Sequence, residues 1–274
     1  MNPFVDGAFE AKFLTGDTYS SQHASAGIFS RMMPSLSFYS RLFLGPVRWL
    51  CARASKGLCD DTAWVYASAW VADLIERMGC PIEIEGMNAI EAVDGPCLFV
   101  ANHMSTLETF MLPAMIRPRR PVTFVVKKSL TTMPLFGPVM CSRDPIVVGR
   151  TNPREDLTAV LEGGLERLRK GISIIVFPQH TRSREFNPQM FNSIGVKLAK
   201  KAGVPIVPLA LKTDAWGQGT KIKELGPVKV GMTVRYNFAS PISVTGQGKE
   251  EQAAICQHIE RLLGQWQQLD GSNA

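Results

Sequence analysis

Two short segments hold the residues best suited to chemistry, and each follows directly on an apolar run. In the first, residues 97–110, the run Cys-Leu-Phe-Val-Ala leads into Asn102 and His103, and Ser105 and Glu108 come next. A carboxylate bound to one ring nitrogen of a histidine fixes the tautomer and makes the other nitrogen a better base. His103 and Glu108 are therefore candidates for a general base and the group that orients it.

A structural explanation of the same residues is equally open. Ser105 and Glu108 match the Ser-x-x-Glu capping box, in which the glutamate satisfies backbone donors at the start of a helix. Five positions apart within one helix, His103 and Glu108 would point about 140° apart. They can meet only if His103 lies in the turn before the helix, so the spacing alone leaves a structural and a catalytic role open.

The second segment, residues 172–186, contains a run of Ile and Val that stops at Pro178. The following turn presents six polar residues: Gln179, His180, Thr181, Arg182, Ser183 and Arg184. Because a guanidinium group can hold a phosphate or carboxylate through two parallel hydrogen bonds, we expect an anion site here. Lys127, Lys128 and Arg143 supply further cations between the two segments.

Both segments must be positioned by strands, because open α/β sheets bind ligands at the carboxyl ends of their strands. Short apolar runs predict strands at residues 81–86, 97–102, 122–126, 145–148, 172–177 and 205–211. Helical patterns cover residues 106–116, 154–171 and 191–203, and a strand-like segment (228–240) and a closing helix (249–266) follow. This alternation indicates an α/β fold with a mostly parallel sheet flanked by helices.

The N-terminal third has a different character. Residues 1–27 are small, polar and aperiodic, and we expect a flexible tail. Residues 28–58 carry five basic and no acidic residues among aromatics and leucines, which is typical of a helical segment in a membrane interface. Gly45-Pro46 should break this segment in two. A second amphipathic helix at residues 61–79 completes a predicted membrane-interface anchor, residues 28–79; packing on the protein's own core is the alternative for both parts.

Composition excludes several classes of protein. The 274 residues are 45% apolar and 20% charged, which excludes disorder as the main state, and a net charge of +6 is too dilute for a nucleic-acid binder without a recognisable module. The six cysteines form no C-x-x-C pair, so neither a metal site nor a disulfide framework is expected, and reduced cytoplasmic thiols fit better. No secretory signal or membrane-spanning helix is predicted either.

Four segments together resemble the motif blocks of glycerolipid acyltransferases, the enzymes that acylate lysophosphatidic acid and related lysophospholipids. They are ANHMSTLE, FVVKKSLTTMPLFGPVMCSR, FPQHTRS and VPIVPL, in the order and spacing of that family. The resemblance runs from about residue 80 to about residue 245. It implies an acyltransferase domain in residues 80–274.

The resemblance also implies roles for individual residues. His103 would remove the proton of the acceptor hydroxyl, Glu108 would orient the ring, and the hydroxylate would attack the thioester of acyl-CoA or acyl carrier protein without an acyl-enzyme. That donor is a co-substrate, and no cofactor is implied. The acceptor site would consist of Arg143 and Arg182 on the phosphate, Lys128 as their helper, and Gln179 and Thr181 near the glycerol.

Two departures from the family pattern concern the acceptor. The dyad acid is Glu108, where aspartate is commoner, and the third block reads FPQHTRS where FPEGTRS is commoner. Gln179 therefore lacks a charge, and His180 brings a titratable ring in place of a glycine. The double change Gln179→Glu with His180→Gly is expected to shift acceptor preference. His180 is a rival base, but His103 has the carboxylate at the matching spacing.

The expected function is a peripheral O-acyltransferase on the cytoplasmic face of a membrane. It would acylate a lysophospholipid such as 1-acyl-glycerol-3-phosphate in phospholipid biosynthesis, with the membrane surface as a partner and no nucleic acid. Another lyso-lipid, such as an aminoacyl lipid, or glycerol 3-phosphate is the alternative acceptor. The non-enzyme alternative is a catalytically silent lipid-binding protein, against which the intact His103/Glu108 pair argues.

Overall fold

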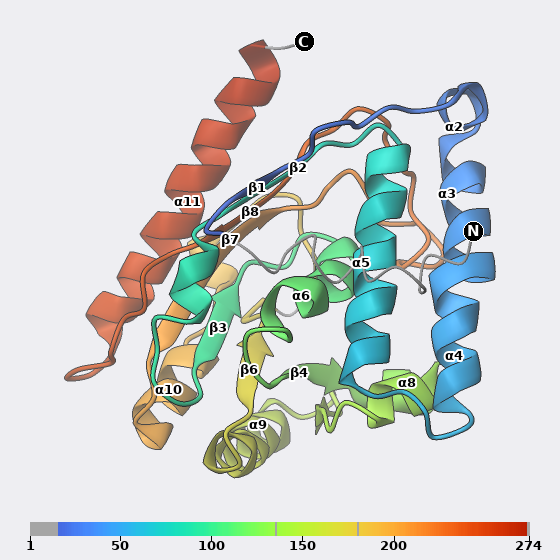
Figure 1. The fold of residues 1–274 in the computed structure, drawn as a ribbon. Helices are drawn as coiled ribbons and strands as arrows, with labels where there is room; N and C mark the ends of the chain where they lie inside the picture. Colours follow the sequence, from blue (N-terminus) through green and yellow to red (C-terminus); the bar gives the residue numbers. More distant parts are fainter. Residues whose placement is uncertain (1–15, 135, 180, 273–274) are drawn as a thin grey trace.

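An eight-stranded sheet forms the centre of the protein, in the order β1-β2-β8-β7-β3-β6-β4-β5 (Figure 1). A computed structural model describes residues 16–272, except Leu135 and His180. The strands are β1 (Tyr19–Ser20), β2 (Ile82–Glu85), β3 (Leu98–Ala101), β4 (Val122–Lys127), β5 (Ile146–Val148), β6 (Ser173–Val176), β7 (Ile206–Lys212) and β8 (Val234–Phe238). Pairs β1–β2 and β7–β8 are antiparallel and the other pairings are parallel, so the predicted mostly parallel α/β fold is confirmed.

Side chains of the central strands alternate between two apolar layers, as strands with both faces covered require. On β3, Phe99 and Ala101 belong to one buried cluster, whereas Leu98 and Val100 belong to the other. Helices cover both layers: α5 (Asp61–Arg77) and α6 (Leu107–Ile116) lie on the first, and α9 (Pro153–Arg169), α10 (Ile194–Ala202) and α11 (Lys249–Ser272) on the second (Figure 1).

The N-terminal helical region runs beside α5 at one side of the sheet (Figure 1). It consists of α2 (Ile28–Met32), α3 (Pro34–Leu42) and α4 (Arg48–Ala54). The predicted break is confirmed, because Gly45 leaves the helical conformation (φ −99°, ψ −110°) and Pro46 follows it inside the kinked turn Phe43–Val47.

This region has an inner and an outer side. Phe38, Leu42 and Leu50 are buried in the core. The opposite side exposes an outer apolar row: Ile28, Phe29, Met32, Met33, Leu36, Phe43 and Leu44. Within the described part of the chain, no helix is both long and apolar enough to cross a membrane.

Helix α5 is packed inside the protein, which is the alternative stated for residues 61–79. It lies between α6 and the N-terminal helical region, and its apolar residues, including Trp64, Val71 and Ile75, are buried. The alternation of Ala with larger apolar residues lets neighbouring helices approach from both sides. The interface prediction therefore applies to residues 28–58 alone.

The predicted flexible tail also needs correction. Residues 1–15 lie outside the described part of the chain, but Tyr19 and Ser20 form β1, which pairs antiparallel with β2. Side-chain hydrogen bonds hold this edge strand in place, because Tyr19 Oη and Ser21 Oγ each donate to Oε1 of Glu76 at 2.6 Å.

Short helices fill the connections. The turn-rich segment between β4 and β5 contains α7 (Lys128–Thr131) and α8 (Gly137–Cys141), and single helical turns lie at Met87–Ile90 and Pro188–Met190. Helix α11 continues to Ser272, beyond the predicted end at residue 266. Its last turn is held by Asp270, which pairs with Lys212 of β7 and Arg235 of β8 at 2.8 and 2.6 Å.

Candidate active site

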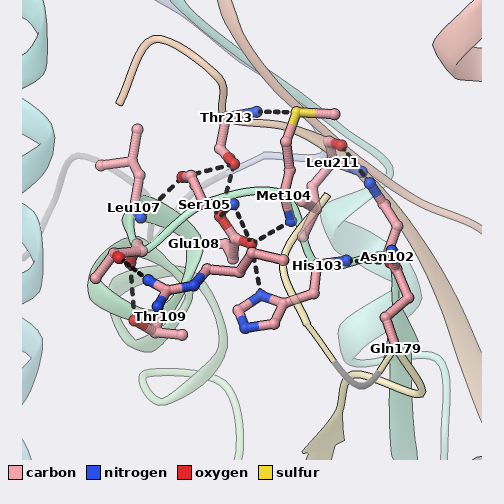
Figure 2. Close-up of polar contacts among 12 residues, drawn as sticks. Asn102, His103, Met104, Ser105, Leu107, Glu108, Thr109, Gln179, Leu211 and Thr213 are labelled. Carbon is pink, nitrogen blue, oxygen red and sulfur yellow. Dashed lines mark hydrogen bonds and ion pairs between the residues drawn. The ribbon is translucent and has the colours of Figure 1, made fainter. Parts of the chain in front are cut away.

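Three neighbouring parallel strands carry the candidate site at their carboxyl ends. Strand β3 lies between β6 and β7. His103 comes shortly after β3, Gln179 and Arg182 come after β6, and Thr213 comes directly after β7. Segments far apart in the sequence therefore meet at one edge of the sheet (Figure 2).

His103 and Glu108 are brought together as the catalytic alternative requires. Nδ1 of His103 lies 2.8 Å from Oε1 of Glu108 (Figure 2), because His103 lies in the turn before α6 and Glu108 in its first turn. The Glu108 side chain is fully buried, whereas 13% of the His103 side chain is exposed. With Nδ1 held by the carboxylate, Nε2 is the ring nitrogen free to exchange a proton with a substrate.

One of the two capping-box contacts is present, and the other is shifted by one residue. Oγ of Ser105 accepts a hydrogen bond from the backbone N–H of Leu107 at 3.0 Å, and Glu108 accepts one from the N–H of Ser105 at 2.9 Å. One carboxylate thus caps the helix and holds the imidazole. The two explanations of Glu108 are compatible.

Further donors surround the buried carboxylate. Oε1 of Glu108 accepts from the N–H of Met104 at 2.7 Å, and Oε2 accepts from Oγ1 of Thr213 at 2.6 Å and Oγ of Ser105 at 3.0 Å (Figure 2). Burial acts to raise the pKa of Glu108, but the hydrogen bonds from His103 and Thr213 and the charge of the imidazole outweigh it and lower the pKa. Glu108 is therefore ionised at neutral pH.

The segment after β6 fixes the position of His103. The backbone N–H of His103 donates to Oε1 of Gln179 at 2.6 Å, and its carbonyl accepts from the N–H of Ser183 at 2.9 Å. Its ring stacks on Phe177, with centroids 4.4 Å apart and planes inclined by 17°. Gln179 is buried and contacts the histidine backbone, so it positions the base; a glutamate carboxylate could accept the same hydrogen bond.

Asn102 joins the ends of β3 and β7. Its Nδ2 donates to the carbonyl of Leu211 at 2.8 Å, and its Oδ1 accepts from the N–H of Leu211 at 2.9 Å (Figure 2). This pair of bonds extends the strand pairing by one residue. His103 and Thr213 therefore leave the sheet side by side.

Arg182 lies beside the dyad, at the start of α6. Its Nη1 donates to Oγ1 of Thr106, and its Nη2 pairs with Oε1 of Glu224 at 2.7 Å. Lys128, at the start of α7, and Thr181 are exposed. His180, the rival base, lies outside the described residues.

Arg143 is not brought to this site. Its Nη1 pairs with Asp61 at 2.9 Å, its Nη2 donates to the carbonyl of Cys59, and its guanidinium lies 5.3 Å from the ring centroid of Trp64. These contacts fasten the start of α5 to the segment that precedes β5. Arg143 lies before a strand, whereas the site is built where strands end, so its predicted place on the acceptor phosphate is not supported.

Arg150 is a cation that the sequence analysis missed. Burial and the positive charge of Arg182 lower the pKa of Arg150, which places the two guanidinium groups within electrostatic reach. Its backbone is left-handed (φ 58°), and its N–H donates to Oδ1 of Asp156 at 3.1 Å. The signal that could have found Arg150 is its place two residues after β5, at the carboxyl end of a predicted strand. Thr213 was missed although it obeys the same rule.

Among residues 16–272, leaving aside Leu135 and His180, no group of three or more His, Cys, Asp or Glu residues is arranged to hold a metal ion. All six cysteines are free thiols.

Comparisons with known proteins agree with the motifs. Residues 81–212 match the family model described as Acyltransferase. The chain is 27% identical over 202 residues to a 1-acyl-sn-glycerol-3-phosphate acyltransferase of Pseudomonas aeruginosa, covering 74% of each protein. It is 28% identical over 239 residues to the protein of that name from Cocos nucifera, covering 86% of this chain and 71% of that relative.

A solved structure shares the fold. The crystal structure of the 1-acyl-sn-glycerophosphate (LPA) acyltransferase PlsC from Thermotoga maritima matches with a TM-score of 0.65 at 18% identity, covering 86% of this chain and 95% of the other. The motif segments and the match over residues 81–212 agree with each other. This chain is an acyltransferase, similar in sequence to 1-acyl-sn-glycerol-3-phosphate acyltransferases.

Proposed function

We propose that the protein transfers a fatty acyl chain from a thioester to the hydroxyl of a lysophospholipid such as 1-acyl-sn-glycerol-3-phosphate, at a membrane surface, in phospholipid biosynthesis. The observation that carries this proposal is the His103–Glu108 pair, 2.8 Å apart, at an edge of the sheet that also holds Arg182. The names of the relatives from Pseudomonas aeruginosa and Cocos nucifera support this acceptor.

The proposed chemistry uses the dyad as a general base. Nε2 of His103 accepts the proton of the acceptor hydroxyl, and Glu108 stabilises the imidazolium that forms. The hydroxyl oxygen attacks the thioester carbonyl, so a carbon–oxygen bond forms and the carbon–sulfur bond breaks. The leaving thiolate takes the proton from His103. This sequence needs no acyl-enzyme and leaves the cysteines of the protein without a role.

Arg182 and Arg150 are proposed to hold the phosphate of the acceptor, with Lys128 and Thr181 at the rim. Two guanidinium groups that repel each other gain most from a dianion between them, because each positive charge then faces a negative one. The effect of Arg182 on the pKa of Arg150 supports this pairing. Gln179 takes part through the backbone of His103.

The donor is proposed to be acyl-CoA or acyl carrier protein, and the reaction needs no cofactor besides this co-substrate. A thioester brings its own leaving group. The step that we propose for His103 is therefore complete without a metal or a prosthetic group.

The membrane contact is proposed to be the outer apolar row of α2, α3 and the kinked turn. Exposed Arg31, Arg41 and Arg48 flank the row and suit anionic headgroups on the cytoplasmic face of a membrane. A quadruple variant, in which Ser replaces Ile28, Met32, Leu36 and Leu44, should show reduced flotation with anionic vesicles. Undiminished flotation would contradict this assignment.

Thiol release from acyl-CoA by the purified protein, across a panel of lysolipids, tests the reaction itself. Release that depends on the acceptor and disappears in His103→Ala is expected, with lysophosphatidate as the preferred acceptor. An absence of thiol release with both acyl-CoA and acyl-(acyl carrier protein) would instead favour a lipid-binding protein.

A further inference from the structure

A loop late in the sequence carries a second surface of mixed basic and apolar character. Residues 217–227, the Glu224 loop, are closed at their base by the bridge between Trp216 and Val228. The tip of the loop exposes two lysines and two large apolar side chains: Lys221, Ile222, Lys223 and Leu225. Lysines interleaved with apolar residues suit the headgroup region of an anionic bilayer.

The loop is continuous with the proposed membrane surface of α3. Oη of Tyr39 donates to the carbonyl of Gly226 at 2.6 Å, and the N–H of Val228 donates to Oγ of Ser35 at 3.1 Å. Both Tyr39 and Ser35 belong to α3, whose neighbour Leu36 is part of the outer apolar row. A bilayer lying on α3 therefore lies close to the Glu224 loop.

The inner side of the loop reaches the active site. Oε1 of Glu224 lies 2.7 Å from Nη2 of Arg182, and the carbonyl of Glu224 accepts a 3.0 Å hydrogen bond from Nε1 of Trp216. Nε2 of Gln218 donates to the carbonyl of Met104, the residue after His103, at 3.4 Å. The same loop thus contacts both the anion site and the dyad segment.

Glu224 and an acceptor phosphate compete for one guanidinium. Glu224 binds Nη2 of Arg182 and Thr106 binds Nη1, so a phosphate that takes the hydrogen bond of Nη2 must displace the carboxylate. Two anions at one guanidinium would also repel each other. The Glu224 side chain is 51% exposed, and such pairs contribute little to stability, so displacement is easy.

We propose that the Glu224 loop is a membrane-responsive gate, in which Glu224 occupies the acceptor-phosphate site on Arg182 until the loop tip sits on an anionic bilayer. This proposal rests on the proposed function, because it assumes that Arg182 binds the acceptor phosphate and that α3 faces the membrane. Contact of Lys221 and Lys223 with headgroups would draw the tip outward and release Arg182. The acceptor site would then open at the membrane, where the lysophospholipid acceptor is located.

The first test uses Glu224→Gln with a short-chain lysophosphatidate below its critical micelle concentration. Without vesicles, this variant should show an acceptor KM lower than that of the wild type by up to about fivefold, the range of one exposed ion pair. Phosphatidylglycerol vesicles should lower the wild-type KM toward the value of the variant, and phosphatidylcholine vesicles should not. Glu250→Gln, which removes the same charge from α11, is the matched control and should behave as the wild type.

The second test concerns the loop tip. The double change Ile222→Ser with Leu225→Ser should reduce flotation with phosphatidylglycerol vesicles and the response of the acceptor KM to them. The control pair Met190→Ser with Leu269→Ser replaces two apolar side chains elsewhere that are together at least as exposed, and it should do neither.

Failure of the gate is distinguishable from failure of the proposed function. An unchanged KM in Glu224→Gln, or equal responses of the wild type to both kinds of vesicle, would overturn the gate while acyl transfer still depended on His103. Acyl transfer that survives His103→Ala, or an acceptor KM that is unaffected by Arg182→Gln, would overturn the proposed function and the gate with it.

Discussion

The hydroxyl of Thr213 donates a 2.6 Å hydrogen bond to Oε2 of Glu108, across 105 positions of the chain. The other carboxylate oxygen, Oε1, holds Nδ1 of His103 at 2.8 Å. Because each oxygen has its own partner, the carboxylate cannot turn without losing one of them. Thr213 therefore sets the direction in which Glu108 presents its charge to the imidazole, and it is a positioning residue for the dyad.

Replacing Thr213 by Val should lower kcat roughly tenfold or more, because losing a hydrogen bond to a charged group costs about 1.5–3 kcal/mol. The acceptor KM should not change, since Thr213 is fully buried. Thr213 helps to lower the pKa of Glu108. Its removal should raise that pKa, so protonation of the Glu108 carboxyl, followed by infrared spectroscopy, should move to higher pH. Thr213→Ser keeps the donor and should restore both kcat and the carboxyl titration, whereas a Val variant with the wild-type kcat and carboxyl titration would contradict this role.

Shortening Glu108 to Asp should also impair the reaction, although aspartate is commoner in the family. The carboxylate would retreat by one methylene, about 1.5 Å, and could not reach His103 and Thr213 together. We expect kcat to fall roughly tenfold in steady-state assays, the loss of one charged hydrogen bond. Glu108→Gln keeps the length but cannot balance the imidazolium, so its loss should be larger. Equal activity of the Asp and wild-type enzymes would show that the helix start adapts.

Arg150 and Arg143 should respond differently to the same substitution. Arg150→Gln removes a charge beside Arg182 and should raise the acceptor KM roughly tenfold, the effect of a charged hydrogen bond, with the donor KM unchanged. Arg143→Gln breaks the contacts with Asp61 and Trp64 and should lower the melting temperature without a selective effect on the acceptor. The opposite result, in which Arg143→Gln raises the acceptor KM, would show that Arg143 binds the acceptor phosphate.

The ion pairs of Asp270 should give the protein a pH-dependent stability. Partial burial acts to raise the pKa of Asp270, but the hydrogen bonds from Lys212 and Arg235 lower it below the usual value. Since the folded pKa lies below the unfolded one, the contribution is complete above about pH 4 and disappears as the pH falls through the folded pKa.

Asp270→Asn should therefore lower the free energy of unfolding at pH 7 by about 1 kcal/mol, because Lys212 and Arg235 each lose one of two carboxylate partners and keep Asp214 and Glu83. Urea unfolding should show this difference shrinking below about pH 4, where the wild-type carboxyl also becomes protonated. Glu260→Gln, on the exposed side of the same helix, is the control. A difference that stays constant from pH 7 to pH 3 would mean that Asp270 acts through packing alone.

The central part of the fold was predictable because its strands are buried on both faces. Apolar runs such as residues 172–177 stand out from the polar helix patterns around them, and each predicted run contains a strand. Strand β1 has two residues in a polar stretch, and only its pairing with β2 makes it a strand. The end of α11 likewise depends on Asp270 reaching cations on other strands, which no local pattern records.

The dyad was predictable and its surroundings were not. The spacing of His103 and Glu108 is a local property of one turn and one helix start, so the sequence contains it. Which cation lies near Arg182 depends on which strands are neighbours in the sheet. No single segment of the sequence determines that strand order. That is why the sequence analysis named Arg143 and contained neither Arg150 nor Thr213.

The order of the strands also affects when a newly folding chain becomes active. Strand β3 pairs on one side with β6 and on the other with β7, and every partner lies far along the chain. Contacts of this kind form slowly, because closing long loops costs entropy before any pairing offsets it. A refolding chain can therefore regain its helices while it is still unable to transfer an acyl group. Recovery of turnover reports the last pairing to form rather than the first collapse.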